Sequence, residues 1–453
     1  MSTLRKSLGP YRECLKVDKQ LITLHADIRV DGCGELLEDL TINDPEFRDW
    51  LADQALLTDT AEVSQTPASH ASARPQLFSI LENSTGDAGF FSALVSDAIL
   101  QRLVEAGSIA TFEAPCLEPN PSRLTFLLRT NAMRQGKHSG IRIRLEAAET
   151  GSVIWTGQRV LQSDDLSQLE TVEIRRLMNQ AVDAAVERYS RLRPSKSAAS
   201  HSSALCFRAV SKMFSLGHSE LLEAEDMLTK ASLLDDRGIY LAWRAYLKVI
   251  QYGERVVTDR AAMAEEANML VAHALEHGPG NSMVLALASY VQSVIFKKYE
   301  VGSELAEQSL GVSQINPSAW AFLGIARMHL GAMEDAYQFT SYARKISGHG
   351  PQRYQLNMLA CQTAMVTGRL VEAMKLAELT VGMAPNYAPP KRYLAALLID
   401  ADREQDARQV LSDLKRLETS FSFGQMADPN YPASALRLSP LGERLNSLSQ
   451  RLS

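Results

Sequence analysis

The first residues that could do chemistry in this sequence are two histidines. His273 and His277 stand four apart in a stretch that predicts a helix, so both imidazoles would lie on one helix face, where they could bind a metal. The segment reads HALEH, which is not the H-E-x-x-H zinc motif, and no third ligand is evident. We therefore expect ordinary surface histidines and no metal site.

The stretch ENSTGDAGFF is a candidate anion site, because amide groups ahead of a helix attract negative charge. It matches neither G-x-G-x-x-G nor the G-K-[ST] of a phosphate loop, so a helix-capping loop is expected. The acidic stretches LEDLTINDPEF and LQSDDLSQLE fall at expected helix starts, where carboxylates complement the helix dipole. Cys116 and Cys361 have no recognisable His and Asn partners. The sequence thus predicts no catalytic residue and no cofactor, and we expect that the protein is not an enzyme.

Composition points to an ordinary globular protein. The chain has 453 residues, enough for several domains, and its net charge of -6 gives no whole-chain case for nucleic acid or an anionic membrane. The five cysteines are scattered and never form C-x-x-C, which is typical of reduced thiols. The N-terminus lacks a signal-peptide core, and no apolar run approaches the ~20 residues of a membrane span. A cytoplasmic protein without a membrane partner is expected.

Residues 1–54 predict a short basic helix end, closed by Gly9-Pro10, then a small β-hairpin and an acidic helix. LRKSLGPYRECLKVDKQLITLHADIRVD resembles the end of the recognition helix and the wing of bacterial transcriptional activators of the OmpR and antibiotic-regulator type. INDPEFRDWL is similar to the segment that follows the wing in some members.

The given sequence starts after the first two helices of the winged-helix pattern; if Met1 is the true start, we expect a truncated winged-helix remnant with weak, salt-sensitive DNA binding at most. Its candidates for contacts to the DNA backbone are Arg5, Lys6, Arg12, Lys16 and Lys19.

After a Ser-, Thr- and Ala-rich linker at residues 55–74, residues 75–192 predict a domain of mixed β-sheet with helices on one face. The expected strands are QLFSI, SIATF, residues 124–133, residues 141–148 and SVIWTGQRVL, with helices at residues 89–106 and 166–189. ENSTGDAGFFSALVSDAILQRLVE and IRIRLEAAETGSVIWTGQRV resemble the TolB-like domain of proteobacterial regulators. The resemblance implies an interaction or sensory module.

A second linker is expected at residues 193–203, and residues 204–418 then repeat a helical hairpin about six times. The best-defined copy, WAFLGIARMHLGAMEDAYQFTSYA, resembles a tetratricopeptide unit, in which Gly324 lets Ala336 of the second helix approach. Pairs of small residues seven apart recur, as in Ala224 with Ala231 and Ala373 with Thr380. Residues 419–453 are expected to cap the last repeat. The fold class is therefore α+β multidomain, with an all-α solenoid at the C-terminus.

If the first helices line a concave side, nine positions in three successive repeats converge on one groove that suits an apolar peptide or helix. They are Ala321, Ile325, Met328, Met358, Gln362, Met365, Arg392, Ala396 and Ile399. The alternative is that these residues are plain core, or are covered by the middle domain.

The resemblances imply a bacterial transcriptional regulator. Its α/β domain and solenoid would bind a protein partner or signal and so alter how the N-terminal module engages DNA. The alternative is a scaffold that binds protein and no DNA.

Overall fold

In the computed structural model of this chain, the described residues are 15–18, 21–24, 76–82, 86–107, 109–113, 125–135, 138–148, 150–161, 171–191, 198–255 and 259–450. The chain forms two units, Met1–Ala71 and Ser72–Ser453, and each is described by itself.

In the first unit, β1 (Leu15–Asp18) and β2 (Leu21–Leu24) pair as an antiparallel hairpin with Leu15 opposite Leu24. The sequence predicts this hairpin. The rest of the expected winged-helix remnant, and the linker at residues 55–74, lie outside the described residues.

The second unit begins with a five-stranded mixed sheet. Its strands are β3 (Gln76–Leu81), β4 (Ala110–Glu113), β5 (Thr125–Gln135), β6 (His138–Ala147) and β7 (Val153–Leu161), in the order β4-β3-β5-β6-β7. β3 is parallel to β4 and to β5, whereas β5, β6 and β7 form two antiparallel hairpins. β5 and β6 extend further toward each other than expected, because their pairing continues to Gln135 and His138.

Two helices, α3 (Gly86–Ala106) and α4 (Val172–Ser190), cover one face of this sheet. Val95 and Ile99 of α3 and Leu177 of α4 are fully buried against the inward-facing strand residues. Thr171 caps α4, since its side chain accepts a hydrogen bond from the Ile174 amide. Gly157 of β7 lets α4 approach, because a Cβ there would lie 2.5 Å from the Leu177 Cδ1 atom.

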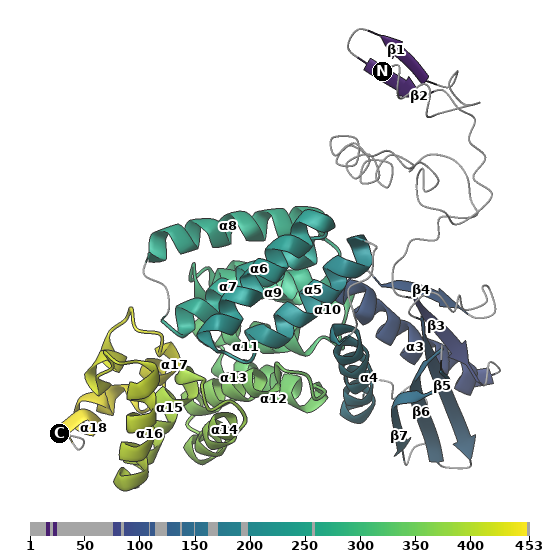
Figure 1. Cartoon of the computed structure of the whole chain (residues 1–453). Helices are drawn as coiled ribbons and strands as arrows, with labels where there is room; N and C mark the ends of the chain where they lie inside the picture. The colour runs from purple at the N-terminus through teal and green to yellow at the C-terminus, as the bar shows by residue number, and fades with distance from the viewer. Residues whose placement is uncertain are drawn as a thin grey trace. The chain divides into compact units, whose positions relative to one another are not determined.

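Residues 198–417 form six helical hairpins in the described structure (Figure 1). The first three are α5 (Ala198–Met213) with α6 (His218–Leu234), α7 (Gly238–Gly253) with α8 (Arg260–His277), and α9 (Ser282–Val294) with α10 (Tyr299–Val312). The others are α11 (Pro317–His329) with α12 (Met333–Ile346), α13 (Arg353–Val366) with α14 (Leu370–Met383), and α15 (Ala388–Asp400) with α16 (Glu404–Leu417). α5 begins inside the stretch expected as a linker.

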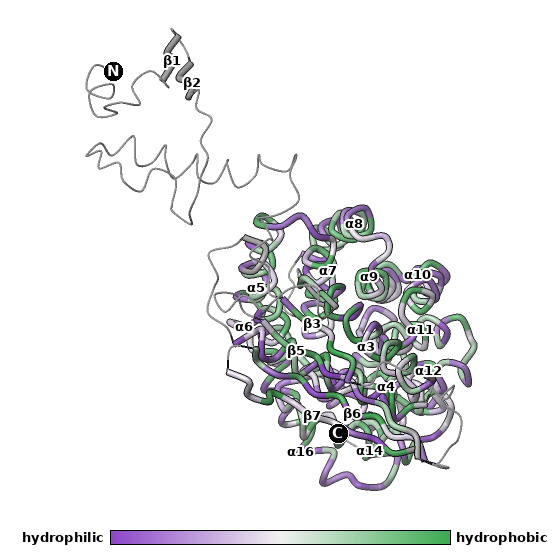
Figure 2. The backbone as a smooth tube through the Cα atoms, turned by 90° about the vertical axis from the view of Figure 1, so that its right-hand side faces the viewer, coloured by the Kyte–Doolittle hydropathy of each residue, from purple (hydrophilic) through white to green (hydrophobic). Residues whose placement is uncertain are grey.

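The small residues act within the hairpins as the sequence predicts. A Cβ on Gly324 would lie 2.6 Å from the Thr340 Cγ2 atom and 2.9 Å from the Ala336 carbonyl oxygen, so only glycine allows this approach of α11 to α12. Ala336 and Ala343 are fully buried. In Figure 2 the helices carry both hydrophobic and hydrophilic residues along their length, as expected of helices that bury one face.

The C-terminal tail folds as η3 (Phe423–Ala427), α17 (Ser434–Leu438), η4 (Gly442–Arg444) and α18 (Leu445–Gln450). It contacts α15, near the end of the solenoid, but α17 also packs on α13 of the fifth hairpin. The tail therefore covers more of the solenoid than its last repeat. No helix in the described part of the chain is long and apolar enough to cross a bilayer.

Candidate functional site

The predicted partner groove is filled. Eight of its nine residues are buried and none of these is more than 3% exposed: Ala321, Ile325, Met328, Met358, Met365, Arg392, Ala396 and Ile399. The ninth, Gln362, is half-buried. In the described structure these positions are core, which corrects the expectation of an open groove at this place.

Aromatic side chains fill the inner side of the solenoid. We call them the inner aromatic cluster: Phe214, Trp243, Tyr246, Tyr290, Phe322, Tyr354 and Tyr387. The Tyr290 and Phe322 rings stack with centroids 4.3 Å apart, and the Tyr354 hydroxyl donates to the Phe214 carbonyl oxygen at 3.0 Å. Since Phe214 follows α5 and Tyr354 lies on α13, the first and fifth hairpins touch across the inner side.

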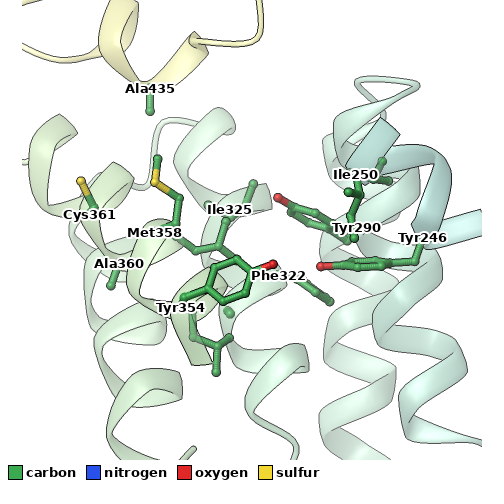
Figure 3. Packing of buried hydrophobic residues seen from close by; sticks show 14 of the residues in the cluster. Tyr246, Ile250, Tyr290, Phe322, Ile325, Tyr354, Met358, Ala360, Cys361 and Ala435 are labelled. Atoms are coloured by element: carbon green, nitrogen blue, oxygen red, sulfur yellow. The ribbon is translucent and has the colours of Figure 1, made fainter. Parts of the chain in front are cut away.

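Figure 3 shows how the expected groove is covered. Tyr246, Tyr290 and Phe322 lie together beside Tyr354, and Met358 lies below Ala435 of the C-terminal tail. Both Met358 and Ala435 are buried. The inner side is therefore sealed by contacts between hairpins and by the tail.

A buried ionic cluster holds the second hairpin against the sixth. Arg392 is fully buried and donates to the Glu418 carboxylate at 3.0 Å and to the Gly253 carbonyl oxygen at 2.9 Å. Arg255 donates to the same carboxylate at 3.2 Å, and the Tyr431 hydroxyl donates to both of its oxygens at 3.1 and 3.0 Å. We call Glu254, Arg255, Arg392, Glu418 and Tyr431 the closing cluster.

Glu254 is the member of the closing cluster whose carboxylate is incompletely hydrogen-bonded. Its carboxylate accepts from the Ala388 amide at 3.4 Å, but Oε1 is shielded from solvent and has no hydrogen-bond partner among the described residues. Burial raises the pKa of Glu254 to about 7, against the attraction of Arg392 and the Ala388 amide, and with repulsion from Glu418. We therefore expect the charge of Glu254, and with it the stability of the closing cluster, to change with pH near neutrality.

The helix-covered face of the sheet is occupied as well, because α4 packs on the solenoid. The Asn179 side-chain amide donates to the Ile315 and Ile346 carbonyl oxygens at 2.9 and 3.0 Å. Asp183 accepts from the Gly350 amide at 2.8 Å, and burial raises its pKa to about 6. In Figure 1, α4 stands between the strands and the solenoid helices.

The end of α3 is tied to the loops between hairpins. Arg237 donates to the Gly107 carbonyl oxygen at 2.7 Å, and Asn281 donates to the Glu105 carbonyl oxygen at 2.9 Å. Phe207 of α5 and Ile315 belong to the same buried core as the sheet. The α/β domain and the solenoid thus share packing and polar contacts.

We call the exposed part of that other face, on β5, β6 and β7, the outer sheet face. On β6 the buried Ile141 and Ile143 alternate with outward residues, as in a strand with one buried side. Strand register gives three outward rows: Met133, Gly140 and Val160; Asn131, Arg142 and Gln158; Arg129, Arg144 and Thr156.

The first row is apolar and open. Met133 and Val160 are 62% and 70% exposed. Among the described residues, a Cβ on Gly140, between them, would meet only the Arg159 carbonyl oxygen within 4 Å, at 3.8 Å. Because Gly140 has no side chain, the row has a gap between two exposed apolar side chains at one end of the outer sheet face, and we call this gap the notch.

The next rows are basic. Arg129 and Arg144 donate to the Glu146 carboxylate at 2.9 and 3.1 Å. Burial alone would raise the pKa of Glu146, but these hydrogen bonds and charges outweigh it and hold that pKa below its ordinary value. Arg142 is exposed and has no ion-pair partner among the described residues. The rows keep a net positive charge at pH 7.

The other predicted residues contribute no site in the described part of the chain. Lys16 lies in β1, and Arg5, Lys6, Arg12 and Lys19 lie outside the described residues. His277 pairs with Asp236 at 3.3 Å, and no group of three or more possible metal ligands occurs among the described residues.

Cys361 is buried and its pKa is raised to about 12 by burial. Such a thiol is a poor nucleophile.

The catalytic and binding motifs considered in the sequence do not point to the outer sheet face. Its signal was present in IRIRLEA, where apolar and charged residues alternate. That alternation predicts a strand with one side exposed, and the exposed side carries Arg142 and Arg144.

No protein-family model and no curated protein matches the chain. Two solved structures of MamA, one of MamA AMB-1 and one of a MamA mutant, are 18% and 17% identical to it, with a TM-score of 0.27 each. Each match covers 43% of this chain and 100% of the other.

Proposed function

We propose that this chain is a scaffold or adaptor that binds a protein partner on the outer sheet face, without enzymatic activity and without DNA binding of its own. The single observation that carries the proposal is that exposed apolar and arginine side chains meet on this face. Methionine and arginine are enriched in protein interfaces. The inner side of the solenoid, by contrast, is filled by the inner aromatic cluster and the tail.

The solenoid then has a supporting role. It holds α3 and α4 through hydrogen bonds such as those of Asn179 and Arg237, and so it fixes the sheet on which the partner would bind. A binding surface supported by packed elements loses little conformational entropy on association. The tetratricopeptide and TolB-like resemblances are consistent with such a module, and we place the protein in the cytoplasm.

Site-specific photo-crosslinking tests the proposal in the cells that naturally produce the protein. A photoreactive amino acid would replace Gln158 on the outer sheet face or, as a matched control, Glu265 on the exposed side of α8. We expect a discrete crosslinked protein from position 158 and none from position 265. Crosslinks from position 265 alone, or from neither position, would count against an interaction at the outer sheet face.

A second candidate is the transcriptional regulator, and the β1–β2 hairpin favours it because a winged helix carries such a hairpin as its wing. In that case Arg5, Lys6, Arg12, Lys16 and Lys19 would contact phosphates. A gel-shift titration with duplex DNA decides between the two candidates. Tight, sequence-specific binding that persists at physiological salt would favour the regulator, whereas absent or weak, salt-sensitive binding favours the scaffold.

A further inference from the structure

We infer that the partner segment is an extended, acidic stretch of protein in which one large apolar residue is followed or preceded, two positions away, by aspartate or glutamate. This inference rests on the proposed function and adds the chemistry of the partner. The observation behind the inference is that the apolar row with the notch lies next to the row that contains Arg142 on the outer sheet face.

The notch fits one apolar side chain. Met133, Gly140 and Val160 stand on adjacent strands in one row. Neighbouring strands are about 4.8 Å apart, so the side chains that flank Gly140 start about 10 Å from each other. A leucine or phenylalanine of the partner can lie over the glycine and touch both neighbours.

The basic row fixes where the acidic residue must be. Arg142 follows Gly140 by two positions on β6, which is about 7 Å along the strand. In an extended partner segment alternate side chains point the same way, so residues two apart have the same separation. A carboxylate two positions from the apolar anchor therefore meets Arg142, which has no ion-pair partner of its own among the described residues.

Arg142 dominates this recognition. Arg129 and Arg144 share the Glu146 carboxylate and are already neutralised in part. A second acidic residue, four positions from the anchor, would add a smaller and more salt-sensitive contribution at these two arginines.

Two other occupants fit less well. A second copy of this chain would bring one outer sheet face onto another, and the unpaired Arg142 side chains would repel each other. A single-stranded nucleic acid would find positive charge, but the three rows contain no aromatic ring on which a base could stack. An acidic protein segment satisfies both the charge and the notch.

Selection of random peptides displayed on phage against the full chain tests the inference, with the binding of the enriched peptides then measured by fluorescence anisotropy. We expect peptides with an apolar residue two positions from Asp or Glu. Arg142→Glu and Gly140→Leu should each weaken binding at least about tenfold. Lys375→Glu, the same charge change at an exposed position of α14, should not alter it.

The inference is wrong if no peptide is enriched, if the enriched peptides lack this spacing, or if Arg142→Glu and Gly140→Leu bind them as the parent chain does. Displacement of the peptides by single-stranded nucleic acid at low concentration, or self-association that Arg142→Glu abolishes, would also overturn it. A crosslink at position 158 combined with any of these results leaves the proposed function standing and rejects only the chemistry of the partner.

Discussion

The closing cluster makes a quantitative prediction through Glu254. Its pKa in the folded chain is about 7, whereas the ordinary value is 4.5. Between these pH values the folded state holds a proton that the unfolded state has released, so stability falls as pH rises through this window and stays low above it. At 1.36 kcal/mol per unit of pKa, the penalty above pH 7 is at most about 3 kcal/mol.

Glu254→Gln removes the ionisable group and keeps its shape. We expect the free energy of unfolding of this variant, relative to the parent chain, to rise by about 2 to 3 kcal/mol between about pH 5 and about pH 8. Urea titrations followed by far-UV circular dichroism across this range measure the difference. Glu265→Gln, at an exposed site, is the control and should show no such rise. A pH-independent difference between the Glu254 variant and the parent would refute the raised pKa of Glu254.

Three further substitutions test the closed solenoid. Arg392→Met removes the fully buried one of the two guanidinium groups that bind the Glu418 carboxylate and should cost about 3 kcal/mol in urea unfolding; a loss within error would show that the closing cluster is not needed. Gly324→Val places carbon against Thr340 and should cost about 1 to 3 kcal/mol by overpacking, measured as a lower thermal midpoint; an unchanged midpoint would contradict the close approach. Met358→Glu buries a charge in the core and should destabilise by about 4 kcal/mol or more, so a fully stable variant would mean that this position is an open surface after all.

The helical hairpins were predictable because their signals are local. Gly324 and Ala336 predict a closely packed pair of helices, and Asn316-Pro317 predicts a helix boundary. In the structure Asn316 caps α11, since its side chain accepts from the Ser318 amide at 3.1 Å, with Pro317 in the first turn. The strands of the sheet were predictable for the same reason, through alternation over a few residues.

The closure of the solenoid was not predictable from such signals. An apolar residue such as Met358 looks the same in a sequence whether it lines a groove or fills a core. Whether such a residue is exposed or buried depends on the curvature of the array of helical hairpins. This curvature brings Arg255 to Glu418, 163 positions apart, and Glu254 to Ala388, 134 positions apart. No local pattern encodes contacts at that distance, and for this reason the expected groove was assigned to residues that are buried.

The location of the binding site is tested most directly by the amide groups that a bound peptide protects from hydrogen exchange. Amide hydrogen exchange would be measured on the full chain with and without a peptide selected on it. We predict slowed exchange in β5, β6 and β7 with the first helices of the solenoid unchanged. Protection along α11, α13 and α15, with the sheet unchanged, would show that the inner side opens to bind and would contradict the account.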